Sequence, residues 1–237
     1  MNIGNVILKL DKEWDMEEMA TLSKLYIQCY SLVFSLSDFA LKTNDERAFD
    51  WFKGTYANYP WRGGFSAVNF YNSLYAKIPY EQRPIIIEIR YASPGHIKLK
   101  EAVLVAGMLA GIVAAITTSI DNVHDTYNKI QSGMSQRKLT KLEVNIKELQ
   151  LKQEQMKFIR DSKKQLIEEL EIPKLMQSEL SRRSDENELM DLKILMSFYR
   201  RLEPLALLQG NEKLFLVNPN QNSSNNSNSA DAEKTRG

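Results

Sequence analysis

The sequence predicts an α+β protein in which a small N-terminal three-stranded sheet covered by helices precedes a long apolar helix and a charged helical arm. Short apolar runs separated by turn residues lie in the first hundred residues, and charged and apolar residues at helical spacing follow position 120. The nineteen residues 102–120 carry no charge. The predicted parts are an α+β domain (1–100), the apolar helix with its extension (101–133), a helical arm with a terminal hairpin (134–217) and a disordered tail (218–237).

The composition limits the partners that we expect. The 31 basic and 30 acidic residues leave a formal net charge of +1, which predicts no general attraction to nucleic acid. Lys alternates with Glu in the helical arm instead of forming a basic stripe, so we expect no nucleic-acid partner. Cys29, the single cysteine, excludes an internal disulfide. It lies on the apolar face of a predicted helix, where we expect a small core residue instead of a nucleophile.

The N-terminal part begins with a strand and a capped helix. Val6–Leu10 is a short apolar run that is typical of a strand. Asp15 precedes Glu18 by three residues, which is the spacing of a capping box at a helix start. Apolar residues then recur at three- and four-residue intervals up to Val33, which predicts a helix that ends between about Ser35 and Ser37.

A strand, a turn and a second strand close this part. Ile85–Tyr91 is continuously apolar at first and then alternates, as in a mostly covered strand with one face becoming exposed to water. Ser93–Gly95 has the composition of a turn, in which proline fixes φ and glycine takes a positive φ. We expect His96–Leu99 to return as an antiparallel strand, which gives a sheet of three strands.

The segment Trp61-Arg62-Gly63-Gly64 is one candidate ligand site. A Gly-Gly loop that enters a helix exposes backbone N–H groups at the positive end of the helix dipole, and Arg62 could bind an anion beside them. The alternative is structural: the glycines permit a tight turn, Trp61 fills the core and Arg62 pairs with a carboxylate. Neither a GxGxxG nor a Walker spacing is present, which favours the structural interpretation.

Ser93 and His96 form the second candidate motif. They are conceivable as a nucleophile and its base, but no GxSxG motif is present, and turn chemistry accounts for both residues. The only other histidine is His124, and neither histidine has neighbours at zinc-ligand spacing. We therefore predict no catalytic residue, no metal ligand and no cofactor, and the sequence leaves open whether the chain is an enzyme.

Two blocks of the N-terminal part carry a resemblance to a protein family. YPWRGGFSAVNFYN (Tyr59–Asn72) and IRYASPGHIKL (Ile89–Leu99) resemble the WRGG(F/Y)SAVNFYN and YASPG-type blocks of an uncharacterised bacterial family. The resemblance covers roughly the first hundred residues and treats both blocks as parts of one domain. It implies a bacterial source and a shared N-terminal module. The family has no established activity, so the resemblance implies no catalytic role.

The uncharged segment 102–120 allows two interpretations. As a helix it would rise about 28 Å, close to the roughly 30 Å hydrocarbon core of a bilayer. Gly107 and Gly111 form a GxxxG motif, which brings two helices close together in a bilayer. A helix buried in protein uses the same small residues to lie against a sheet or a partner. If the segment spans a membrane, Lys98 and Lys100 favour a cytoplasmic N-terminal domain, so we expect a cytoplasmic or inner-membrane protein.

The remaining chain predicts packed helices. We expect the apolar helix to continue past Ile120 to a corner at Gly133. Apolar residues at helical spacing from Leu189 to Leu202 predict a later amphipathic helix that breaks near Pro204, and Leu205–Val217 should form a terminal hairpin. The a and d positions of a short coiled coil are occupied by Leu139, Leu142, Ile146, Leu149 and Met156.

These features favour a non-enzymatic interaction or assembly protein, a homo-oligomer or the partner of another protein, with a single-pass membrane helix left open. The residues expected to mediate association are Gly107, Gly111, Leu142, Ile146 and Leu149. The alternative is a ligand-binding or hydrolytic N-terminal domain whose site is formed by the WRGG loop and the SPGH turn. That alternative requires the two motifs to meet.

Overall fold

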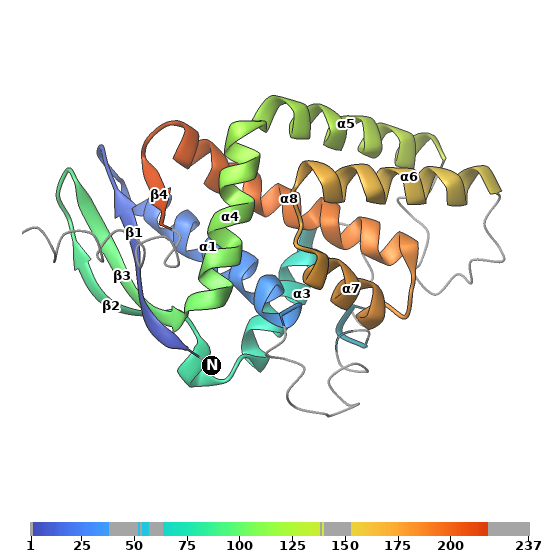
Figure 1. The fold of residues 1–237 in the computed structure, drawn as a ribbon. Helices are drawn as coiled ribbons and strands as arrows, with labels where there is room; N and C mark the ends of the chain where they lie inside the picture. The colour runs from blue at the N-terminus through green and yellow to red at the C-terminus, as the bar shows by residue number, and fades with distance from the viewer. Residues whose placement is uncertain are drawn as a thin grey trace, which may run out of the picture.

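A computed structural model of the chain describes residues 2–37, 52, 54–56, 64–137, 139 and 153–217. These residues form a four-stranded antiparallel sheet beside a body of helices (Figure 1). The α+β class is confirmed, and the prediction of three strands is wrong because a short C-terminal strand joins the sheet. The elements are β1 (Ile3–Leu10), α1 (Met16–Ser35), α3 (Gly64–Lys77), the 3-10 helix η2 (Tyr80–Gln82), β2 (Ile85–Arg90), β3 (Gly95–Ala102), α4 (Val103–Thr118), α5 (Ile120–Gln136), α6 (Gln153–Glu169), α7 (Lys174–Arg183), α8 (Glu188–Gly210) and β4 (Leu214–Leu216).

The strands lie in the order β2-β3-β1-β4, so β2 and β4 form the two edges of the sheet. In the β1–β3 pair, Ile3 is opposite Ala102 and Leu10 is opposite Gly95. Strand alternation sends every second residue of β1 towards the helices, including the buried Leu8. The other face of β1 and β3 carries mostly polar and charged residues, as expected of an antiparallel sheet with one exposed face.

The fourth strand comes from a segment in which we expected a hairpin. Helix α8 continues through Pro204 to Gly210, so the predicted break at the proline is wrong. The chain then turns, and β4 pairs with β1, with Leu214 opposite Leu10. The terminal hairpin is therefore also wrong: Leu214–Leu216 pairs with the first strand of the protein instead of with its own neighbour.

Helix α1 begins at the predicted capping box. The Glu18 backbone N–H donates to Asp15 Oδ1 at 2.7 Å, and the Asp15 backbone N–H donates to Glu18 Oε2 at 3.0 Å. The helix ends at Ser35, as the apolar periodicity predicted.

The apolar run after β3 forms α4, which ends at Thr118. The next helix, α5, begins at Ile120 and is bent by 91° from α4, so the prediction that one helix continues past Ile120 is wrong. At the bend, the Ser119 hydroxyl donates to the Ala115 carbonyl at 3.1 Å. Such back-bonding by serine competes with the regular helix ladder and favours bending. The bend lets α4 lie against α1 and α8 while α5 runs beside α6 (Figure 1).

Gly133 lies inside α5 and does not form the predicted corner. The helix ends at Gln136, and Gly133 is the place where the Phe158 ring of α6 approaches α5. A Cβ atom at position 133 would lie 2.5 Å from Phe158 Cζ, so the glycine permits this close approach. The Arg137 guanidinium covers the same ring at 4.2 Å from its centroid.

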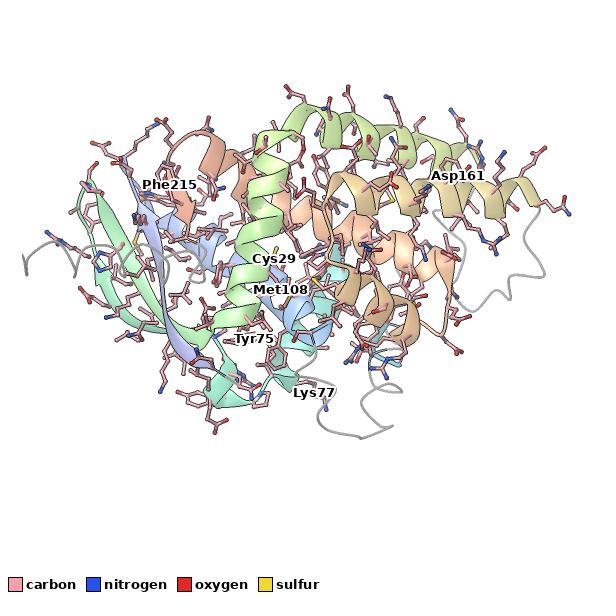
Figure 2. The ribbon with its side chains drawn as sticks, in the orientation of Figure 1. Cys29, Tyr75, Lys77, Met108, Asp161 and Phe215 are labelled. Carbon is pink, nitrogen blue, oxygen red and sulfur yellow. The ribbon has the colours of Figure 1, made fainter. Side chains whose placement is uncertain are left out.

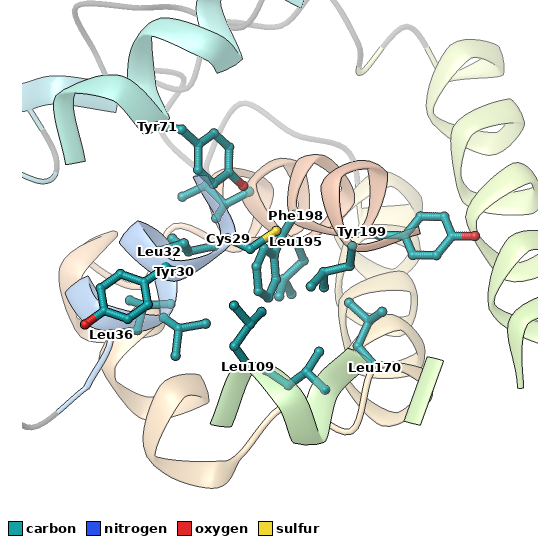
Figure 3. Packing of buried hydrophobic residues seen from close by; sticks show 14 of the residues in the cluster. Cys29, Tyr30, Leu32, Leu36, Tyr71, Leu109, Leu170, Leu195, Phe198 and Tyr199 are labelled. Carbon is teal, nitrogen blue, oxygen red and sulfur yellow. The ribbon is translucent and has the colours of Figure 1, made fainter. Parts of the chain in front are cut away.

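The core is organised around α8. This helix contacts α1, α4, α5, α6 and α7, and all its residues from Leu189 to Tyr199 are buried. Figure 3 shows Leu195 and Phe198 of α8 near Cys29 of α1 and Leu109 of α4. The hydrophobic cluster extends from Leu8 to Leu214 and therefore includes parts of the predicted N-terminal domain, the apolar helix and the arm. The predicted domain boundaries themselves stay a prediction.

Candidate functional site

The predicted SPGH turn joins β2 to β3, and its two polar side chains have different carboxylate partners. The Ser93 hydroxyl donates to Asp11, and this hydrogen bond lowers the pKa of the Asp11 carboxyl. His96 Nε2 lies 3.3 Å from Glu88 Oε1 on the neighbouring strand. No hydrogen bond joins Ser93 to His96, although the structure describes both residues. Ser93 is thus hydrogen-bonded to Asp11 and not to His96.

Gly95 in this turn is required for a different reason than we expected. Its φ is not positive, which contradicts the predicted left-handed conformation. A Cβ atom at this position would instead lie 2.6 Å from the carbonyl oxygens of both Ala92 and Arg90. The glycine therefore permits the backbone to double back closely.

The WRGG motif lies mostly outside the described residues. Trp61, Arg62 and Gly63 belong to that part, and Gly64 begins α3. In Figure 1, α3 lies among the helices and the β2–β3 turn lies at the outer end of the sheet. Whether the two motifs form one ligand site stays a prediction.

A buried carboxyl group, which the sequence analysis missed, lies between β3 and α1. Glu101 is completely buried, and the Tyr26 hydroxyl donates to its Oε1 at 2.7 Å. Its Oε2 has no hydrogen-bond partner among the described residues. Burial raises the pKa of Glu101 to about 8, against the smaller opposing effect of the Tyr26 hydrogen bond. The sequence signal that could have identified this group is strand alternation, which places Glu101 on the same inner face as Ile97 and Leu99.

A second buried polar group centres on Arg201 of α8. Its Nε donates to Gln28 Oε1 of α1 at 2.8 Å, and its Nη1 donates to the Ser197 carbonyl at 2.9 Å. The guanidinium lies over the Tyr71 ring of α3, 4.0 Å from the centroid. These contacts join three helices through one side chain. Cys29, beside this group, is fully buried, and burial raises the pKa of its thiol, which confirms its assignment to the core (Figure 2).

A third charged group links α6 to α8. Lys163 Nζ contacts Glu188, and it lies 3.1 Å from Asp191 Oδ2. Burial raises the pKa of Asp191, while Lys163 opposes that change. All three groups connect elements of the fold, and within the described ranges no three His, Cys, Asp or Glu residues are arranged to hold a metal ion.

The exposed feature that stands out is the apolar character of β2. Ile86, Ile87, Ile89 and the following Tyr91 are 52%, 51%, 53% and 73% exposed. Contiguous exposed apolar side chains of this size mark surfaces that contact another molecule. Phe215 of β4 is a smaller apolar exposure at the other edge of the sheet (Figure 2).

The register explains why these side chains are uncovered. Ile86 is opposite Leu99 and Ile89 is opposite Ile97, so both share the sheet face that carries the buried residues of β3. In Figure 1, β2 is the outermost strand, beyond the helices that cover β3 and β1. Among the described elements, the apolar inner face of the sheet thus extends one strand further than the helices that cover it.

The residues predicted to mediate association through the apolar helix and the arm have mixed positions. Gly107 is buried within the fold, whereas Gly111 is exposed. Leu142, Ile146 and Leu149 lie outside the described residues. Within the described ranges no single helix is long and apolar enough to cross a bilayer. Helices α4 and α5 reach the required length and hydropathy only when they are taken together, and the chain bends by 91° between them.

Comparison of the chain with protein-family models, curated proteins and solved structures found no match. This result is consistent with the resemblance to an uncharacterised family that has no established activity.

Proposed function

We propose that the chain is an interaction and assembly protein rather than an enzyme, and that β2 is part of its contact surface. The observation that carries the proposal is the exposure of Ile86, Ile87, Ile89 and Tyr91 on one edge strand. An edge strand presents backbone N–H and C=O groups that a strand of another chain can pair with, and apolar side chains beside them add burial.

Features that protect an edge strand from association are present in β2 only in part. Proteins commonly place charged residues or a bulge on an edge to prevent strand addition. In β2 the pairing with β3 is irregular between Ile86 and Glu88, and Glu88 and Arg90 are charged. The charges lie on one face only, because their partners on β3 are Lys98 and His96. The other face stays apolar, which favours contact over protection.

The apolar helix supports this choice of surface. Most of the apolar residues of α4, including Val105, Leu109, Ile112, Val113 and Ile116, are buried inside the fold. They already have partners within one copy of the chain. Association through the predicted seam of the arm is a separate prediction.

The proposal is tested by replacing Ile86 and Ile89 together with threonine, which keeps the β-branched shape but adds a hydroxyl group. We expect the double variant to lose association, measured as the molar mass of the full chain by light scattering. Ile7→Thr is the matched control, because Ile7 is a partly exposed strand residue on the other face of the sheet. Association that survives the double substitution unchanged would contradict the proposal.

A further inference from the structure

The proposed function does not identify the partner of β2. On the basis of that function, we infer that the partner is a second copy of this chain. The two β2 strands pair antiparallel about a twofold axis that passes beside Ile89. The two sheets then join into one continuous sheet across the dimer. Closed twofold dimers of this kind use the same surface of both copies.

The charges of β2 select this register. In an antiparallel pair centred on Ile89, Glu88 of each copy is opposite Arg90 of the other copy, because the residue numbers of opposite positions add up to a constant. The dimer thus contains two equivalent Glu88–Arg90 pairs on the charged face. Opposite charges in directly opposite positions stabilise a strand pair, and like charges destabilise it.

The neighbouring registers are less favourable. A pair centred on Glu88 places the two Glu88 side chains opposite each other, and a pair centred on Arg90 does the same with two arginines. A pair centred on Ile87 falls on the irregular part of the strand, between Ile86 and Glu88. The register centred on Ile89 uses the regular residues Glu88–Arg90.

The apolar face of β2 is also self-complementary in this register. Ile89 of one copy is opposite Ile89 of the other, on the face that also carries Ile86. Aliphatic pairs of this kind are favourable cross-strand contacts. The C-terminal segment 218–237 of the same chain is a poor alternative occupant, because it contains no large apolar residue.

The charge register is tested with two single variants and their mixture, measured by analytical ultracentrifugation of the full chain. Glu88→Arg and Arg90→Glu each place like charges opposite each other, so each alone should weaken the dimer about tenfold. An equimolar mixture of the two variants should restore dimers, because the two arginines on the strand of the first variant then face the two glutamates on the strand of the second. Lys157→Glu on α6 is the control for a charge change at an exposed residue away from the sheet.

A cysteine variant tests the position of the axis. Ile89→Cys should form an intermolecular disulfide under mild oxidation, because Cα atoms of opposite residues lie roughly 4.5–5.5 Å apart, within the range that a disulfide spans. Ile87→Cys is the control, since its two copies would lie about 13 Å apart along the strands. The native Cys29 is buried and does not compete.

The outcomes separate this inference from the proposed function. Restored dimers in the mixture, together with crosslinking at position 89 and not at 87, support the inference. A wild-type chain that stays monomeric at about 100 μM, or a dimer that is insensitive to the charge variants, overturns it. If such a monomeric chain binds a different protein and loses that binding in the Ile86→Thr/Ile89→Thr variant, the proposed function stands while the self-pairing fails.

Discussion

Replacing Gly111 and Gly133 with alanine should change the stability of the protein in opposite directions. Both glycines lie inside helices, where alanine is favoured over glycine by about 1 kcal/mol. An added Cβ at Gly111 meets no atom within 4 Å, so Gly111→Ala should raise the free energy of unfolding by about 0.5–1 kcal/mol. An added Cβ at Gly133 would lie 2.5 Å from Phe158 Cζ and 2.6 Å from Phe158 Cε2.

The contact at Gly133 is closer than carbon atoms tolerate, so the Phe158 ring must move. Overpacking of a buried contact costs about 1–3 kcal/mol, which exceeds the gain in helix propensity. Gly133→Ala should therefore lower the free energy of unfolding by about 1 kcal/mol, measured by urea unfolding at low protein concentration. Phe158→Leu in the same chain should reduce that loss, as a double-mutant cycle would show. Equal stabilisation by both alanine variants would refute the assignment of Gly133 to a close α5–α6 contact.

The same Gly111 variant tests association through the GxxxG motif. If the exposed Gly111 lies in a helix–helix contact between copies, alanine should lower the molar mass in solution. We expect the mass to be unchanged, because the proposed contact lies on β2.

Three further substitutions test the buried polar groups. Glu101→Gln should flatten the pH dependence of stability, because the raised pKa means that folded Glu101 keeps a proton that the unfolded chain loses near pH 4.5. The stability of the wild type should therefore fall as the pH rises from about 4.5 to 8, by roughly 1.4 kcal/mol per unit of pKa difference. In urea titrations at pH 8, the variant should gain stability relative to the wild type. Lys163→Met should lower the free energy of unfolding by about 2 kcal/mol because it leaves the buried Asp191 without its cation, while Lys164→Met at an exposed position should change it by less than about 0.5 kcal/mol. Arg201→Lys should lower the thermal midpoint, since lysine cannot make both hydrogen bonds of the guanidinium, and an unchanged midpoint would contradict the three-helix role of Arg201.

Local signals in the sequence predicted the local structure well. The Asp15–Glu18 spacing located the start of α1, the apolar run at Ile85 located β2, and the turn at Ser93–Gly95 located β3. Such signals work because a cap or a strand face is decided by residues that are close in sequence.

The elements that were missed depend on distant contacts. The three-residue β4 is a strand only because β1 lies beside it, so its own sequence carries little signal. The bend at Ser119 contains neither proline nor glycine and follows from the different packing partners of α4 and α5.

The candidate surface was only partly predictable. The apolar run of β2 was visible in the sequence, but we expected a mostly covered strand, and its exposure follows from where the helices end. Arg201 was missed because α8 was interpreted as amphipathic, whereas a helix surrounded by five others also buries its polar side chains.

The pairing of β4 with β1 has a consequence for the synthesis of the protein. During translation β1 leaves the ribosome long before Leu214–Leu216. The side of β1 that pairs with β4 in the folded protein therefore stays without a strand while the residues between β1 and β4 are made. The nascent chain can form the β1–β3 pair once residue 102 has emerged, but it can complete the sheet only after residues 214–216 have emerged as well. A message that is cut short before the codons for Leu214–Leu216 would therefore yield a protein whose first strand is open to pairing with other chains.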